Sequence, residues 1–120
     1  MKAVTGFMRS FVIRSTLVTG LSGTALLASA DQVFPVLPDL WDRPRSARVV
    51  LDQPDIRRAV DMHIGQSGSS LVIHHAEGQE PLLHAEELRA WLIVLAISPE
   101  RVRLSGGLKS GEPLKIEVKP

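Results

Sequence analysis

The sequence predicts an α/β sandwich, in which two helices cover one face of a small mixed sheet in the order β-α-β-α-β-β. Three observations predict it. Residues 70–104 read as a buried strand, a polar loop, the longest amphipathic helix and a second strand. A shorter helical repeat spans residues 54–64, and residues 114–118 alternate between apolar and charged side chains. Two strand–helix–strand crossovers followed by a hairpin give this architecture.

Residues 1–30 have the composition of a secretory signal peptide. Three basic residues and no acid stand in this segment, an apolar run follows, and the segment closes on Ala28-Ser29-Ala30. We expect cleavage between Ala30 and Asp31, with either Met1 or Met8 as the initiator. The apolar run after Arg14 is shorter than the ~20 residues of a bilayer span. The mature chain is therefore expected in the periplasm and not spanning a membrane.

The composition of the mature chain excludes some classes of protein. The sequence has no cysteine, so an exported product must be stabilised by core packing and not by disulfides. Without residues 1–30, 11 basic residues stand against 13 acidic ones, which gives a formal net charge of −2. Because the basic residues are dispersed among acids, we expect no nucleic-acid partner.

Residues 31–46 form a proline-rich segment with apolar side chains between the prolines. This pattern predicts an extended arm that packs its apolar side chains on the domain and contains no helix. The alternative is a docking segment for a partner. The single domain is then expected to occupy residues 47–120.

The elements of this domain follow in order. Residues 47–51 are a β-branched run and the expected first strand, and Asp52 to Asp55 cap the helix of residues 54–64. His63, near the end of that helix, suits the negative end of the helix dipole as a partly charged imidazole. The next strand, entered at Ser69, ends at His74-His75, where Gly78 can take a positive φ and Pro81 suits the first turn of a helix.

The second helix is expected to end before Ser98-Pro99. Trp91 lies at the centre of its apolar stripe, among Leu88, Leu92 and Leu95. Its C-terminal half is apolar nearly all round, which indicates contact with a sheet and a neighbouring helix. Residues 101–104 and 114–118 are the last two strands.

This order of elements, with Arg89-Ala90 in the second helix and Ile97, Arg101 and Val102 beyond it, resembles the OmpA-like peptidoglycan-binding domain over residues 48–118. In that family the second strand ends in a Gly-His-Thr-Asp segment, and the helix carries an Asn, a Leu-Ser pair and Arg-Ala. The resemblance implies a cell-envelope protein in which Arg89 holds a carboxylate of the peptidoglycan peptide.

The chain departs from the family pattern at the other ligand positions. Counting back the family spacing of fifteen residues from Arg89 leads to His74, where the family has the Asp that holds the diaminopimelate ammonium. Leu82 replaces the Asn, and Ala85-Glu86 replaces Leu-Ser. Glu77 is a candidate to replace the lost Asp. The expected ligand-binding residues are thus Arg89, His74 and Glu77, with peptidoglycan binding weak or lost.

The histidines suggest metal binding as an alternative function. His74, His75 and His84 could converge on zinc, with Glu77 or Glu80 as a further ligand. Adjacent strand residues point to opposite faces, however, so His74 and His75 are not expected to chelate together. No Gly-x-Ser-x-Gly elbow or phosphate-binding glycine loop is present.

The expected function is therefore a non-enzymatic periplasmic binding or assembly module of the cell envelope. It has a degenerate OmpA-like fold, and its partner is peptidoglycan or another envelope protein. We expect no catalytic residue, metal or cofactor. The alternative is a small secreted metal-binding protein or hydrolase that uses His74, His75 and His84.

Overall fold

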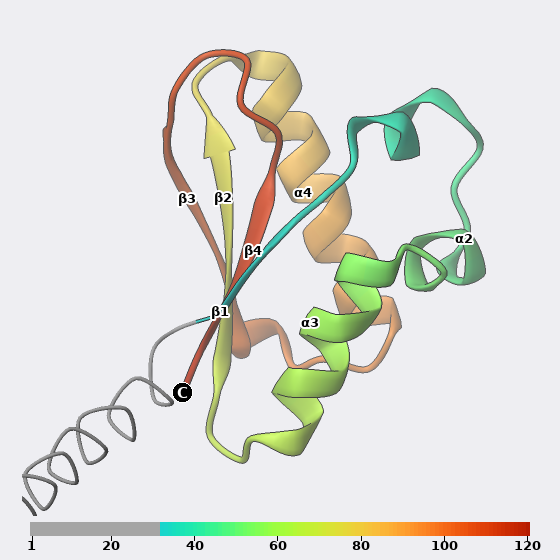
Figure 1. Cartoon of the computed structure of the whole chain (residues 1–120), viewed down its shortest axis with the longest axis vertical. Coiled ribbons are helices and arrows are strands. Elements are labelled where there is room, and N and C mark those ends of the chain that lie inside the picture. The colour runs from blue at the N-terminus through green and yellow to red at the C-terminus, as the bar shows by residue number, and fades with distance from the viewer. Residues whose placement is uncertain (1–31) are drawn as a thin grey trace, which may run out of the picture. The chain divides into compact units, whose positions relative to one another are not determined.

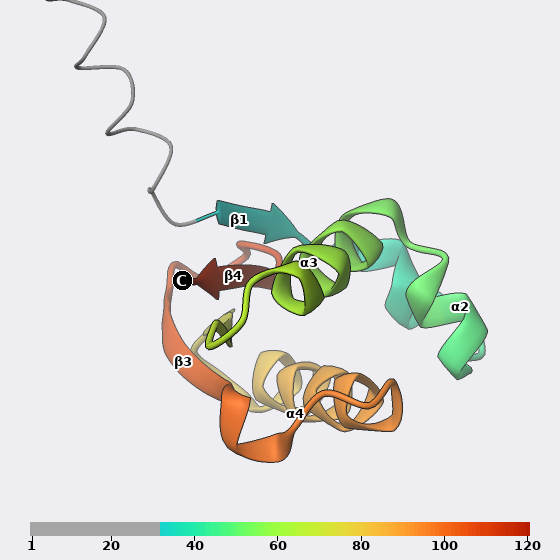
Figure 2. The same ribbon diagram turned by 90° about the horizontal axis from the view of Figure 1, so that it is seen from below.

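The computed structural model describes residues 32–120, which form a four-stranded mixed sheet with its helices on one face (Figures 1 and 2). This confirms the predicted fold class. The predicted signal peptide, residues 1–30, and its cleavage point lie outside the described residues. The elements are β1 (Gln32–Pro35), the 3-10 helix η1 (Pro38–Asp42), α2 (Ala47–Leu51), α3 (Pro54–Gly65), β2 (Ser70–Ala76), α4 (Gln79–Val94), the 3-10 helix η2 (Pro99–Arg101), β3 (Val102–Leu108) and β4 (Lys115–Lys119).

The sheet has the strand order β1-β4-β2-β3, in which β4 is antiparallel to both β1 and β2, and β2 is parallel to β3. The expected C-terminal hairpin is therefore wrong, because β3 and β4 are not neighbours. The chain crosses the carboxyl end of β2 between them (Figure 1). The central place of β4 buries Ile116 and Val118, whereas β3 contributes two glycines and suits an edge.

The first strand lies in the proline-rich segment and not at residues 47–51. That expectation is wrong: residues 47–51 are the short helix α2, in which the Ser46 hydroxyl accepts a hydrogen bond of 3.1 Å from the Val49 amide. The edge place beside β4 belongs to β1, which buries Phe34. The β-branched residues 47–51 thus form a helix despite their strand propensity, because that propensity chiefly reflects packing on a sheet and no place on the sheet is open to them.

The segment expected to be an extended arm is part of the fold. It contributes β1 and η1. The expectation that it contains no helix is therefore also wrong, because η1 is a short 3-10 helix. Val36 and Leu40 are buried, and Trp41 packs against the core. The expectation that its apolar side chains pack on the domain is confirmed.

The core lies between the sheet and the helices. The sheet supplies inward side chains from β2 and β4, including Leu71, Ile73 and Ile116. The core-facing residues of α4 are Ala85, Leu88 and Leu92, all without exposed surface. Trp91, expected at the centre of this stripe, is only half-buried on its flank.

The helix α4 has sixteen residues, and the chain turns sharply after it. Ala96 has a φ of 77°, a left-handed conformation that costs a non-glycine residue energy. This turn returns Ile97 to the core, where it is 4 % exposed. No helix within residues 32–120 combines the length and apolar character needed to cross a membrane.

Candidate functional site

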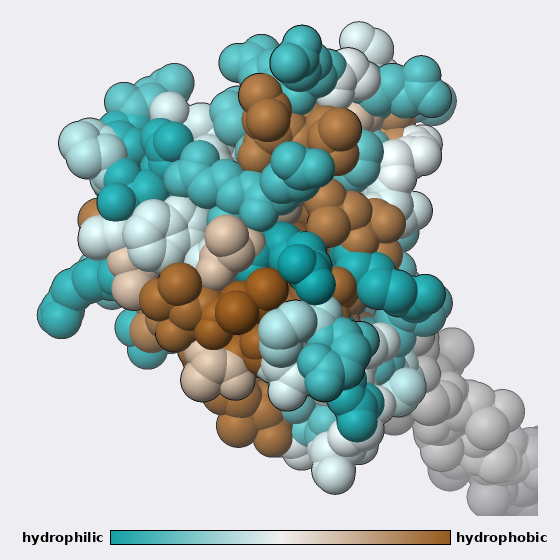
Figure 3. All heavy atoms as spheres, turned by 180° about the vertical axis from the view of Figure 1, so that it is seen from behind, coloured by the Kyte–Doolittle hydropathy of each residue, from teal (hydrophilic) through white to brown (hydrophobic). Residues whose placement is uncertain are grey.

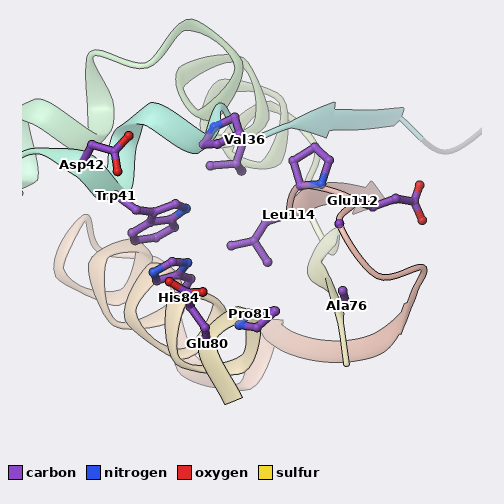
Figure 4. Close-up of a pocket in the computed structure, with 12 residues that line it drawn as sticks. Val36, Trp41, Asp42, Ala76, Glu80, Pro81, His84, Glu112 and Leu114 are labelled. Carbon is purple, nitrogen blue, oxygen red and sulfur yellow. The ribbon is translucent and has the colours of Figure 1, made fainter. Parts of the chain in front are cut away.

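A cavity of about 390 Å³ lies at the carboxyl end of β2. Three segments far apart in the sequence surround it: residues 36–42, the first turns of α4, and the crossover between β3 and β4 (Figure 4). Its lining residues are Val36, Pro38, Trp41, Asp42, Ala76, Glu80, Pro81, His84, Gly111, Glu112, Pro113 and Leu114. Ligand sites of α/β sheets commonly occur at carboxyl strand ends.

The local sequence explains how the first turns of α4 reach this cavity. β2 ends at Ala76, and Gly78 has a φ of 121°, as the sequence predicts. A Cβ on Gly78 would lie 3.5 Å from Cδ of Pro81, so a side chain there would be both strained and close to the next turn. The helix that begins in this way carries Glu80 and His84 to the wall of the cavity.

An aromatic pair forms one wall. The rings of Trp41 and His84 are stacked, with centroids 4.3 Å apart and planes inclined by 3° (Figure 4). They join η1 to α4. Beside them the buried side chains of Val36 and Leu114 give the cavity an apolar surface.

A hydrogen-bonded cluster behind this wall fixes its position. Arg45 donates through Nε and Nη2 to the two carboxylate oxygens of Glu87, at 2.8 and 2.9 Å. Its Nη1 donates to the Trp41 carbonyl at 3.1 Å, and the indole of Trp91 donates to Glu87 at 3.0 Å. The bonds to its carboxylate, from Arg45 above all and to a smaller extent from Trp91, lower the pKa of Glu87. The wall is therefore held by charge-assisted bonds at neutral pH.

The charges that line the cavity are acidic. Asp42, Glu80 and Glu112 line it, and no Lys or Arg does. Glu112 is engaged elsewhere, because it accepts a 2.7 Å bond from the Lys109 amide and lies 3.5 Å from the Lys115 ammonium. Its carboxylate turns away from the cavity (Figure 4).

Asp42 and Glu80 differ from Glu112. Both residues are exposed, and neither side chain makes a hydrogen bond or an ion pair with any other residue of the range 32–120, although both line the cavity. Two carboxylates without partners beside an apolar surface favour a ligand that carries positive charge.

Arg89, the expected carboxylate ligand, does not line this cavity. Its Nε donates to the Val102 carbonyl at 3.1 Å and its Nη2 to the Pro99 carbonyl at 2.9 Å. Arg89 therefore ties α4 to the start of β3. His84, five residues earlier, faces the cavity instead.

His74 and Glu77 also lie outside the cavity. His74 projects from the sheet face away from the helices, where its Nε2 lies 2.8 Å from Oε1 of Glu117. Glu77 is exposed in the loop before α4. The three residues expected to bind a ligand thus do not share a site.

The three histidines of the metal hypothesis are separated as well. His75 points to the opposite face from His74, and its Nδ1 lies 2.8 Å from the Ala76 carbonyl, while His84 stacks on Trp41. Within the described part of the chain, no three His, Asp or Glu side chains are placed to hold a metal ion.

A serine and a histidine lie together at the other end of β2. Nδ1 of His63 is 2.7 Å from Oγ of Ser69, which also donates to the His63 carbonyl at 3.2 Å. Ser69 is 1 % exposed, so its hydroxyl cannot reach a substrate. Burial, with a smaller effect of Arg101, lowers the pKa of His63. This pair is a structural contact.

Sequence reasoning missed Asp42 and the cavity role of His84. It named Glu80 as a possible metal ligand, and Trp41 belongs to the apolar side chains of residues 31–46 that it expected to pack on the domain. The weak signal was the neighbouring aromatic and acidic pair in the proline-rich segment. The chain matches no protein-family model, and no curated protein is significantly similar to it.

Proposed function

We propose that this chain is a non-enzymatic binding or assembly module of the bacterial cell envelope, and that it holds its ligand in the cavity at the carboxyl end of β2. The observation that carries the proposal is the presence of two partnerless carboxylates, Asp42 and Glu80, beside an apolar surface. The wall around them is fixed by the contacts of Trp41, His84 and Arg45. A fixed, concave and partly apolar site is typical of small-ligand recognition.

The chemistry of the cavity favours a ligand with an ammonium or guanidinium group on an aliphatic stem. The stem would contact Val36 and Leu114, and the cation would lie beside the stacked rings of Trp41 and His84, near the carboxylate of Glu80 or of Asp42 (Figure 4). The peptide of peptidoglycan offers such a group, and so does a basic side chain of an envelope protein. The periplasmic location rests on the signal peptide predicted from residues 1–30.

The position of Arg89 supports weak rather than tight peptidoglycan binding. Its guanidinium is bonded to the backbone of Pro99 and Val102, and no Lys or Arg replaces it in the cavity lining. A peptide carboxylate would therefore lack a cationic partner. A partner protein that inserts one basic side chain would not meet this difficulty.

The alternative, a small secreted metal-binding protein or hydrolase, has less support. His74, His75 and His84 point in three directions, and the buried Ser69 offers no accessible nucleophile. The proposal requires no cofactor. A zinc titration of the exported protein followed by calorimetry would find stoichiometric binding only if this alternative holds.

The proposed site is tested by neutralising its two free carboxylates together, as Asp42→Asn with Glu80→Gln. Binding of the exported protein to purified sacculi and to basic envelope proteins is measured by sedimentation and pull-down. We expect the double variant to lose about tenfold or more in affinity, since two charge-assisted contacts disappear.

The matched control is Glu86→Gln, which removes an exposed acid outside the cavity. It should bind like the wild type. Equal losses in the control and the double variant would show a general charge effect, and unchanged binding by the double variant would exclude the cavity as the site.

A further inference from the structure

A second cavity, of about 300 Å³, lies at the amino end of β2. Three segments surround this amino-end cavity: the end of α3 with the loop into β2, the turn after α4, and η2, which all lie in the lower part of Figure 1. The seven residues of β2 separate it from the cavity at the carboxyl end by about 20 Å of strand. One small ligand therefore cannot occupy both cavities.

The charge of the amino-end cavity is opposite to that of the first. Among the described residues, Arg101 is the only Lys, Arg, Asp or Glu that lines it, and Arg101 makes no ion pair with any of them. Burial, and to a smaller extent the charge of Arg101, lowers the pKa of His63, which also lines the cavity. The positive charge of Arg101 thus reaches the lining, where no acid compensates it.

The loop before β2 holds the guanidinium of Arg101 in place. Its Nη1 donates to the carbonyl of Gly68 at 2.8 Å and to that of Ser69 at 3.2 Å. The other edge of the guanidinium, Nε and Nη2, makes no hydrogen bond in the part of the chain that the structure describes. Arg45 uses this same pair of atoms, at 2.8 and 2.9 Å, to hold both carboxylate oxygens of Glu87. The free edge of Arg101 therefore suits a carboxylate.

Apolar side chains line the same cavity, and they include Ile64, Leu95 and Ile97. Ile64 is 70 % exposed at the end of α3. In Figure 3, which views the side of α4, hydrophobic atoms gather in the lower half of the molecule, where α3 and α4 end. An aliphatic group that covers such a side chain gains free energy by its removal from water.

The turn after α4 gives the cavity a fixed wall. The Ala96 amide donates to the Ile93 carbonyl at 2.9 Å, and the Ile97 amide donates to the Leu92 carbonyl at 3.1 Å. The cavity is therefore largely formed before a ligand arrives. Its volume of about 300 Å³ stands at the lower end of the range for small-molecule sites, which indicates a small ligand.

We infer that the amino-end cavity binds a small aliphatic carboxylate through the free edge of Arg101. Nε and Nη2 of Arg101 donate to the two carboxylate oxygens, and the aliphatic part of the ligand contacts Ile64 and Leu95. A free acid and the carboxyl terminus of a peptide share this chemistry. The inference does not depend on the site proposed at the carboxyl end of β2.

The test is an NMR titration of the exported protein with three probes. Isobutyrate represents a free acid, N-acetyl-dialanine represents a peptide terminus, and N-acetyl-dialanine amide lacks the carboxylate. Both carboxylates should shift the signals of Ile64, Leu95 and His63 to saturation, and the amide should not. Tighter binding of N-acetyl-dialanine identifies a peptide terminus as the ligand, and equal binding identifies a free acid. The absence of saturable shifts up to about 10 mM of either acid overturns the inference.

Variants locate the binding. Arg101→Lys keeps the charge but removes the paired donors, so the dissociation constant of the carboxylate should rise about tenfold or more. Arg103→Lys is the matched control, because Arg103 is exposed on β3 and does not line the cavity. It should bind like the wild type, as should Asp42→Asn with Glu80→Gln, whose substitutions lie in the other cavity. Equal losses in the two arginine variants overturn the inference.

Ile64→Ser supplies a second variant that leaves the bonds of Arg101 intact. Because Ile64 is 70 % exposed, the fold should tolerate the change, and the loss of aliphatic contact should weaken isobutyrate binding about threefold or more. Unchanged binding in both Ile64→Ser and Arg101→Lys would exclude the amino-end cavity as the carboxylate site.

Discussion

The two ends of β2 both gather polar side chains around a histidine and border a cavity, of about 300 Å³ at the amino end and about 390 Å³ at the carboxyl end, yet they differ in whether those side chains bond to protein partners. At the amino end, Ser69 and His63 bond to each other, and Arg101 donates to the carbonyls of Gly68 and Ser69. At the carboxyl end, Asp42 and Glu80 have no such partners among residues 32–120. A buried polar group with its partners present stabilises the fold, whereas a concave site with partners missing is suited to a ligand.

The comparison has a physical basis in how each end is built. The amino end joins consecutive elements, α3 and β2, so His63 and Ser69 meet at short sequence separation, and Arg101 of η2 adds a contact from a distant segment. The carboxyl end brings together η1, α4 and the β3–β4 crossover, so its polar groups come from distant segments. In the first arrangement the polar side chains bond to each other, and in the second the two carboxylates remain exposed.

The largest expected effect comes from a substitution in the core face of α4, which supports both ends of β2. Leu88 is 0 % exposed at the centre of the core face of α4, and Leu88→Ala should lower the free energy of unfolding by about 2–5 kcal/mol. Both ends of β2 should lose structure in one cooperative transition. Chemical denaturation followed by tryptophan fluorescence measures this change.

Val94→Ala is the control for that variant. Val94 lies on the same helix but is 63 % exposed, so its truncation should change the free energy of unfolding by less than about 0.5 kcal/mol. Similar losses in the two variants would mean that α4 is oriented differently from the structure described above.

The second expected effect separates the two ends. Ser69→Ala removes a hydroxyl that is bonded to both the ring and the carbonyl of His63, and it leaves these partly buried groups without their partner. We expect a loss of about 1–3 kcal/mol in the free energy of unfolding. Ligand binding at the cavity should not change, because the cavity lies at the other end of the strand.

The exposed neighbour Ser67 provides the comparison. Ser67→Ala should be nearly neutral, since this residue is exposed in the loop before β2. If Ser69→Ala weakened binding at the carboxyl end while the protein remained folded, the two ends would be coupled and the contrast between them would fail.

The fold was largely predictable because its signals are local. Helical spacing in residues 54–64, the cap and turn residues Gly78 and Pro81, and the alternation of residues 114–118 each act within one element. The wrong predictions concern positions in the sheet for which distant segments of the chain compete. Residues 47–51 have strand propensity, but β1 occupies the edge beside β4, and the position of β4 between β1 and β2 depends on packing that no local pattern records.

The candidate cavity was less predictable for a related reason. The sequence highlights adjacent histidines, but His74 and His75 diverge because side chains alternate along a strand. Asp42 and His84 are 42 residues apart, and only the packing of η1 on α4 brings their segments to one cavity. The sequence also suggested a partly charged His63 at a helix end, whereas burial lowers its pKa.

The smallest expected effect concerns the pH dependence of the amino end. The pKa of His63 is lowered in the folded protein by burial and by Arg101, so the unfolded chain, with a pKa of about 6.5, takes up the proton more readily. The free energy of unfolding should therefore be highest above this pH and should fall as the pH drops through 6.5 toward the folded pKa. Titration of Glu87 changes the free energy of unfolding only below about pH 4.3, because the pKa of Glu87 is also lowered.

The variant His63→Asn tests this, since its amide can still donate to Ser69. Its denaturation curves between pH 7.5 and 5 should show a shallower decline in the free energy of unfolding than those of the wild type. An identical decline in both proteins would assign the pH dependence to other groups and leave the amino end without a titrating residue.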